Sequence, residues 1–112
     1  VIIAYDSQFY ELIPKLSHNP TARDMFVSNE FLANTTALRN GSLQGAYLMM
    51  AARALGLDCG PMSGFDANKL DAEFFPDGRW RSNFLCSLGE GDPSKLFGRL
   101  PRLDFDESCQ LV

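Results

Sequence analysis

The chain has 112 residues, of which 46% are hydrophobic and 12% aromatic, and this composition is typical of one small globular domain. Its formal net charge of -4 does not attract polyphosphate, which argues against a nucleic-acid partner. No apolar run approaches the roughly 20 residues that span a bilayer, so no membrane insertion is expected. Three cysteines without paired spacing and a single histidine favour a cytoplasmic protein with no disulfide framework and no metal site.

The sequence begins inside an apolar run, Val1–Tyr5, which predicts a buried strand that ends at Asp6. Because domains seldom begin inside a strand, we expect that upstream residues are missing from this sequence. The next apolar face predicts a helix over 8–16, which Pro14 either kinks or breaks. A turn of helix is expected over 21–26.

The strongest helical periodicity in the sequence runs from Asn34 to Leu55. Gly41 and Gly45 each cost about 1 kcal/mol relative to Ala inside a helix. A helix that keeps both glycines is therefore expected to pack closely against another element. Gly56 is placed to end this helix.

A loop is predicted over Gly60–Gly64, followed by a short helix over 67–75 and a second buried strand over 80–89. Residues 94–112 have only weak periodicity and predict an extended C-terminal arm. The order of elements indicates the α+β class. Since two strands alone make a poor sheet, further strands are expected from the missing part or from a partner chain. We interpret residues 1–112 as a single partial domain.

The predicted loop over Gly60–Gly64 can present main-chain N–H groups to a flat ligand. Pro61 restricts φ, and the two glycines allow close backbone approach or a positive φ. From composition alone, a tight connection whose glycines serve only the turn is the favoured interpretation.

The segment from Ala54 to Asp66 has the spacing ALGLD-xx-P-xx-GFD, which resembles the signature of the FMN-dependent nitroreductase family. The resemblance implies a nitroreductase-like α+β fold with a long central helix on a mixed or antiparallel sheet, of which this chain is the C-terminal portion. It implies that one main-chain N–H contacts flavin N5 and that this stretch packs along the FMN ring. The residues at the matching positions are Pro61, Met62, Ser63 and Gly64. Ser63 stands where many members carry Glu.

A second match lies downstream, where Arg99-Leu100-Pro101 resembles the family's phosphate-binding element. The resemblance implies that Arg99 binds the FMN phosphate, with Lys95 as a weaker candidate. A guanidinium suits a phosphate because it donates two parallel hydrogen bonds. Without the family, Lys95, Arg99 and Arg102 read as a solvated basic face.

Three segments, 39–48, 60–66 and 94–103, are similar to the malonic semialdehyde reductase (3-hydroxypropanoate dehydrogenase) branch of the family, which acts in pyrimidine catabolism. The implied function is FMN-dependent NAD(P)H oxidoreduction that reduces malonic semialdehyde by ping-pong hydride transfer. FMN carries the hydride, so no side chain is assigned as catalytic. The alternatives are a broad-specificity nitro or quinone reductase, and a truncated fragment that acts only as a non-catalytic binding module.

The resemblance also implies a homodimer in which each flavin lies between subunits. The Gly- and Ala-rich face of the predicted long helix is consistent with contact to a partner. Asn40 and Leu43 stand where family members reach the partner subunit's flavin. For both residues, packing inside their own domain is the alternative.

Overall fold

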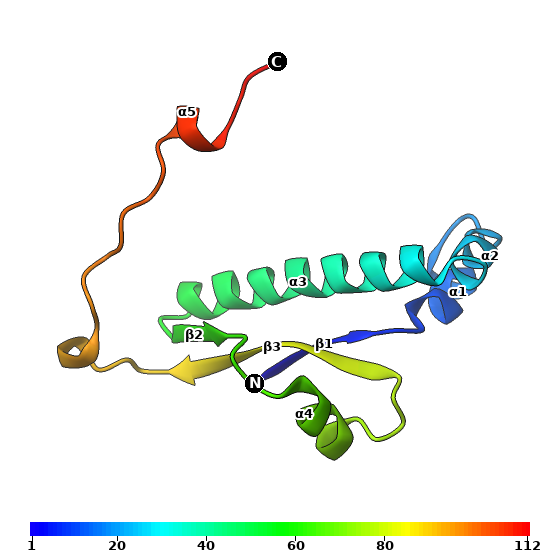
Figure 1. The fold of residues 1–112 in the computed structure, drawn as a ribbon, viewed down its shortest axis with the longest axis horizontal. Coiled ribbons are helices and arrows are strands. Elements are labelled where there is room, and N and C mark those ends of the chain that lie inside the picture. Colours follow the sequence, from blue (N-terminus) through cyan, green and yellow to red (C-terminus); the bar gives the residue numbers. More distant parts are fainter.

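A three-stranded antiparallel sheet carries one long helix across a face in the computed structural model, which describes all 112 residues (Figure 1). The central strand is β3 (Trp80–Gly89), which pairs with β1 (Ile2–Asp6) on one side and with β2 (Asp58–Met62) on the other. The long helix is α3 (Glu30–Ala54). The predicted α+β class is confirmed. The shorter elements are η1 (Phe9–Leu12), α1 (Ile13–Leu16), α2 (Ala22–Val27), α4 (Ala67–Phe74), η2 (Pro93–Lys95) and α5 (Phe105–Ser108).

β2 is the strand that the sequence did not predict. Gly60, Pro61 and Met62 were expected in a loop, yet they pair with β3, and Pro61 lies opposite Cys86. Proline lacks an N–H and fits here because β2 is an edge strand. Long-range pairing with β3 outweighs the low strand propensity of Gly and Pro. At least one of the further strands expected from elsewhere therefore comes from the chain itself.

The predicted helix over 8–16 is broken into two short elements. η1 ends at Leu12, and α1 starts at Ile13 with Pro14 in its first turn, where a missing N–H costs nothing. The ring of Phe9 in η1 meets that of Phe26 in α2 edge-on, with 4.9 Å between centroids. This contact holds the N-terminal helical segments together.

α3 begins four residues earlier than predicted, at Glu30, and is capped at both ends. The side chain of Asn29 accepts a hydrogen bond of 2.9 Å from the N–H of Leu32. At the other end Gly56 has φ 85°, and the N–H groups of Gly56 and Leu57 donate to the carbonyls of Arg53 and Ala52. This is the paired arrangement by which a left-handed glycine satisfies the last carbonyls of a helix.

The small residues of α3 pack against the sheet of their own chain. A Cβ at Gly45 would lie 2.5 Å from Phe84 Cζ, and one at Gly41 would lie 3.0 Å from Tyr5 Cβ. The expected close packing is thus confirmed, because Gly41 and Gly45 face the sheet of their own chain. Contact of this helix with a partner stays a prediction. The buried positions of the helix are Ala33, Ala37, Gly41, Gly45 and Ala52.

Only 7 of the 112 residues are buried, and Ile3 and Cys86 are the two that lie in strands. Two buried strands were expected, but most positions of β1 and β3 are partly or fully exposed, since one long helix covers only part of a small sheet. The radius of gyration is 17.8 Å, against about 13 Å for a compact domain of this length. The difference reflects the C-terminal arm, which runs away from the body (Figure 1). None of the helices combines the length and the apolar character that crossing a membrane requires.

Candidate functional site

The loop after β2 consists of residues 63–66 and exposes its main-chain donors. The N–H groups of Ser63 and Gly64 donate to no acceptor in the chain, and both residues are exposed. The N–H of Phe65 donates to the carbonyl of Ser63 over 3.0 Å, which closes the turn. The carboxylate of Asp66 then accepts from the N–H of Lys69 over 3.1 Å and caps α4. The loop is held at both ends while two donors stay free.

Gly64 faces open space, because a Cβ built there would meet no atom within 4 Å. Its φ is not positive, so the turn itself does not require glycine at this position. The two preceding candidates, Pro61 and Met62, form the end of β2 and are exposed. Of the four candidate flavin-ring residues, two therefore lie in a strand and two in the loop that follows it.

Arg99 lies in the arm and its side chain makes no hydrogen bond or ion pair within the chain. The neighbouring Arg102 differs, because its guanidinium donates to the carbonyls of Leu100 and Pro101 over 2.8 and 3.1 Å. Lys95 ends the short η2 turn, and its ammonium is likewise exposed. Of the two arginines, Arg99 is the one with all its donors available to an anion.

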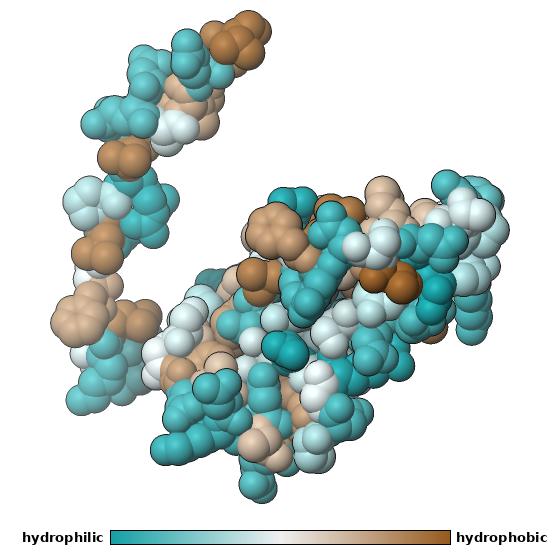
Figure 2. All heavy atoms as spheres, turned by 45° about the vertical axis from the view of Figure 1, so that its right-hand side comes forward, coloured by the Kyte–Doolittle hydropathy of each residue, from teal (hydrophilic) through white to brown (hydrophobic).

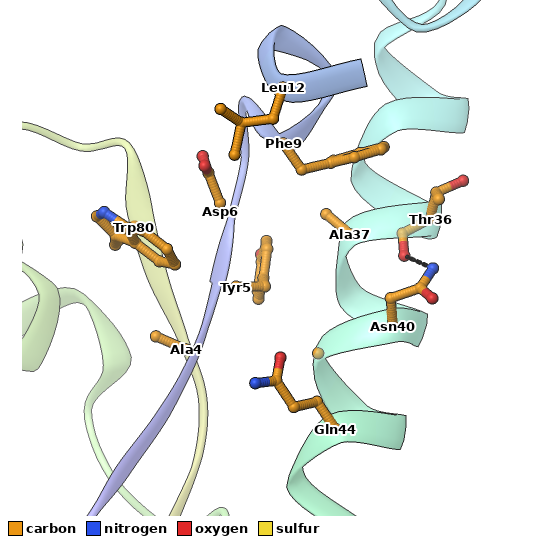
Figure 3. A pocket seen from close by; sticks show the side chains of 11 residues that line it. Ala4, Tyr5, Asp6, Phe9, Leu12, Thr36, Ala37, Asn40, Gln44 and Trp80 are labelled. Atoms are coloured by element: carbon orange, nitrogen blue, oxygen red, sulfur yellow. Dashed lines mark hydrogen bonds between the residues drawn. The ribbon is translucent and has the colours of Figure 1, made fainter. Parts of the chain in front are cut away.

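Asn40 lies elsewhere, in a cavity of about 390 Å³ between α3, η1 and β1 (Figure 3). Its side chain is turned along the helix, where the amide donates to the carbonyl of Thr36 over 2.9 Å. The rings of Tyr5, Phe9 and Trp80 also line this cavity. Leu43 is exposed on α3, outside the cavity.

The candidate residues do not form one cavity in a single chain. Asn40 lines the cavity beside β1, the loop of Ser63 and Gly64 follows β2, and Arg99 lies on the arm beyond β3. A second hollow of about 300 Å³ lies between β2, β3 and the start of the arm, and Leu96 reaches it, but no candidate does. Spacing in the sequence could not reveal this separation.

Asp58 is a residue that the sequence analysis named only as part of a motif. Its carboxylate pairs with Arg53 at the end of α3 and accepts a hydrogen bond of 2.8 Å from the N–H of Gly91. The Gly91 N–H, followed by the Arg53 guanidinium, lowers the pKa of Asp58 below its ordinary value. The available signal was an Asp four residues after the end of a helix whose last turn carries an Arg. The partner Gly91 lies 33 positions away and cannot be found from spacing.

Cys59 follows Asp58 in β2 and is half-buried. Burial, reinforced by the nearby Cys86 thiol, raises the pKa of Cys59 above its usual value. A raised pKa disfavours the thiolate that a nucleophile needs. Cys59 is therefore better suited to packing than to nucleophilic chemistry.

A scan against protein-family models finds no match. Curated proteins do match along the whole chain. Proteins named "Putative NADH dehydrogenase/NAD(P)H nitroreductase" from Ralstonia nicotianae and Rhodopseudomonas palustris are 56% and 59% identical over 112 residues. Each alignment covers 100% of this chain and 57% of the relative, so the chain spans a little over half the length of the curated relatives it matches.

Solved structures show the same fold. A Bacillus subtilis protein described as a "putative nitroreductase" has a TM-score of 0.84 at 22% identity, covering 99% of this chain and 62% of that one. A Staphylococcus epidermidis "putative NAD(P)H:FMN oxidoreductase" has a TM-score of 0.76 at 19% identity, covering 99% and 60%. The fold that these residues form is that of the nitroreductases. In sequence, the chain is a homologue of part of the NADH dehydrogenase/NAD(P)H nitroreductases, which confirms its resemblance to the nitroreductase family.

Proposed function

We propose that this chain is part of an FMN-dependent NAD(P)H oxidoreductase. The observation that carries the proposal is the pair of free main-chain donors at Ser63 and Gly64, beside an open space that a Cβ at Gly64 would not fill. Free N–H donors in a fixed turn suit the acceptor atoms of a flat heteroaromatic ring. The name of the Staphylococcus epidermidis neighbour, an NAD(P)H:FMN oxidoreductase, supports the choice of cofactor.

The residues present fit FMN in two ways. The loop over 63–66 offers its donors and the end of β2 offers the exposed side chain of Met62 to the ring. Arg99 offers an unpaired guanidinium to the phosphate, with Lys95 as a second cation. FMN, when bound, supplies the hydride chemistry, and the chain supplies binding and orientation. NAD(P)H and the acceptor would use the site in turn, by a ping-pong mechanism.

For the acceptor we propose malonic semialdehyde, which would be reduced to 3-hydroxypropanoate. This proposal rests on the similarity of residues 39–48, 60–66 and 94–103 to that branch of the family. The second candidate is a nitro or quinone acceptor, which the names of the curated relatives favour. Initial rates of NADH and NADPH oxidation with malonic semialdehyde, a nitroarene and a quinone separate the two.

We further propose that the protein is a homodimer whose subunits meet on the outward side of α3 and along the arm. Phe31, Tyr47 and Met50 on that helix are 80%, 76% and 73% exposed. Figure 2 shows hydrophobic residues along the top of the body, where α3 lies, and at intervals along the arm. Single exposed apolar residues are ordinary, but such a run of large ones indicates a covered surface. A dimer would also explain why one chain does not gather Asn40 and Arg99 in one cavity.

The first experiment is an absorbance scan of the purified full-length protein, with the released chromophore identified by mass spectrometry. FMN at about one equivalent per chain is the expected result, because the cofactor carries the chemistry. A colourless protein that takes up no added FMN would contradict the proposal. It would leave the non-catalytic binding module as the function that remains.

A further inference from the structure

The C-terminal arm is fastened to the body at one point, where β3 ends. The paired residues of β2 and β3 run as far as Asp58 opposite Gly89. Two residues further on, the N–H of Gly91 donates a hydrogen bond to the Asp58 carboxylate and not to a carbonyl of a neighbouring strand. The same carboxylate pairs with Arg53, and Arg53 also donates to the carbonyl of Leu57 over 3.0 Å. One side chain thus joins the end of α3, the start of β2 and the start of the arm.

The next residues form a hydrogen-bonded turn within the arm, which fixes Lys95 relative to Gly91. The carboxylate of Asp92 accepts from both the N–H and the hydroxyl of Ser94, over 2.9 and 2.7 Å. The N–H of Lys95 donates to the carbonyl of Asp92 over 3.0 Å. Beyond Lys95 the arm makes no hydrogen bond to the sheet or to α3, although Leu96 lines the hollow beside β2 and β3. The position of Gly91 therefore sets the position of Lys95.

We propose that Asp58 is a positioning residue for FMN, which holds the arm at Gly91 so that Arg99 stays within reach of the FMN phosphate. This inference rests on the proposed function. The expected effect on FMN affinity can be estimated from the length of chain between the attachment point and Arg99. Arg99 lies four residues beyond Lys95, a stretch that reaches at most about 14 Å, whereas the chain from Gly89 to Arg99 reaches about 30 Å when the turn from Asp92 to Lys95 is kept. Releasing Gly91 therefore enlarges the volume that Arg99 samples by roughly tenfold, and it lowers the effective concentration of the guanidinium accordingly.

Comparison of FMN with riboflavin, which lacks the phosphate, tests this role. In the full-length protein, Asp58→Ala is expected to weaken FMN about tenfold, by the effective-concentration argument, while riboflavin affinity stays unchanged. Asp58→Asn keeps an acceptor oxygen for Gly91 and is expected to restore most of the FMN affinity. Gly91→Ala is a second variant that keeps the carboxylate. Its Cβ would lie 2.8 Å from Asp58 Oδ2, so the carboxylate must shift and the hydrogen bond is expected to weaken. FMN affinity is then expected to fall in the same direction as in Asp58→Ala.

An Arg99→Ala background makes the test specific, because Asp58→Ala should add no further loss of FMN affinity there. Equal weakening of FMN and riboflavin, unchanged FMN affinity in Asp58→Ala, or full additivity with Arg99→Ala would each overturn the proposal. The rate of amide hydrogen exchange at Gly91 and Lys95 tests the attachment of the arm separately from the proposed FMN function. If the protein binds neither flavin, the proposed function and the phosphate role are contradicted. If amide exchange still speeds up in Asp58→Ala, the attachment of the arm by Asp58 is established independently of both. Unchanged exchange would overturn the fastening itself.

Discussion

At the scale of single residues, the surroundings of two arginines in the same arm distinguish them. Arg102 donates hydrogen bonds to the carbonyls of Leu100 and Pro101, whereas the Arg99 side chain has no hydrogen-bond or ion-pair partner in the chain. Charge counting would treat them as equal members of a basic face. Their hydrogen bonds make Arg99 the residue to test for phosphate binding.

Arg99→Ala is expected to weaken FMN binding about tenfold to a hundredfold, since two charge-assisted hydrogen bonds would be lost. The measurement is a titration of FMN fluorescence with the flavin-free protein. Arg102→Ala is the matched control and should change the affinity little. Equal losses in the two variants would show that the arm acts through its net charge alone.

Asp6 gives a pH prediction. Its side chain is 10% exposed and accepts two hydrogen bonds from Arg79, which lower its pKa. A carboxyl whose folded pKa is depressed contributes stability above its unfolded pKa and loses it as the pH falls through the folded value. The Asp6–Arg79 pair should therefore stabilise the fold fully above about pH 5 and fail progressively below about pH 4.

The check on the Asp6 prediction is the urea midpoint from neutral pH down to about pH 3. Asp6→Asn should lower the midpoint at neutral pH and flatten its decline in acid. Asp106→Asn, which removes a carboxylate from the exposed arm, serves as the control and should keep the wild-type decline. An unchanged acid profile in Asp6→Asn would mean that other carboxyls dominate.

At the scale of elements, α3 is shaped by the sheet beneath it. Gly41 and Gly45 lower its intrinsic helix propensity, but they let its axis approach Tyr5 and Phe84 closely. The cap at Asn29 and the glycine turn at Gly56 then determine its length. Tertiary packing therefore outweighs propensity along this helix.

Gly45→Ala tests this balance. Alanine should add about 1 kcal/mol of helix propensity, but its Cβ would clash with the Phe84 ring at 2.5 Å. Overpacking of this kind costs about 1–3 kcal/mol, so a net loss of stability is expected in chemical denaturation. Glu73→Ala, at an exposed position of α4, is the control and should be nearly neutral. A stabilised Gly45→Ala variant would contradict the close packing.

At the scale of the whole molecule, the small core and the long arm fit a chain that needs further contacts. Seven buried residues supply little hydrophobic stabilisation for 112, and large apolar side chains stay exposed on α3 and the arm. Phe97 is 97% exposed. A second subunit is the occupant that we propose for these surfaces.

Tyr47→Glu is expected to weaken the dimer by about tenfold or more, because it places a charge in an apolar interface. Light scattering coupled to gel filtration, over a dilution series, measures this effect. Leu16→Glu is a matched control, since Leu16 is 75% exposed but lies in α1, away from the proposed interface. A monomeric wild-type protein, or equal effects of both variants, would contradict the proposed interface.

The sequence alone determined the elements whose signals are local. The first and last strands, the long helix and its glycine end follow from apolar periods and from the placement of Gly56, and the motif from Ala54 to Asp66 indicated the family. Only the tertiary structure decided that Pro61 and Met62 belong to a strand, that the Gly- and Ala-rich face packs on its own sheet, and that Asp58 holds Gly91. Each of these depends on a partner more than 20 positions away, and neither residue propensity nor short spacing contains that information.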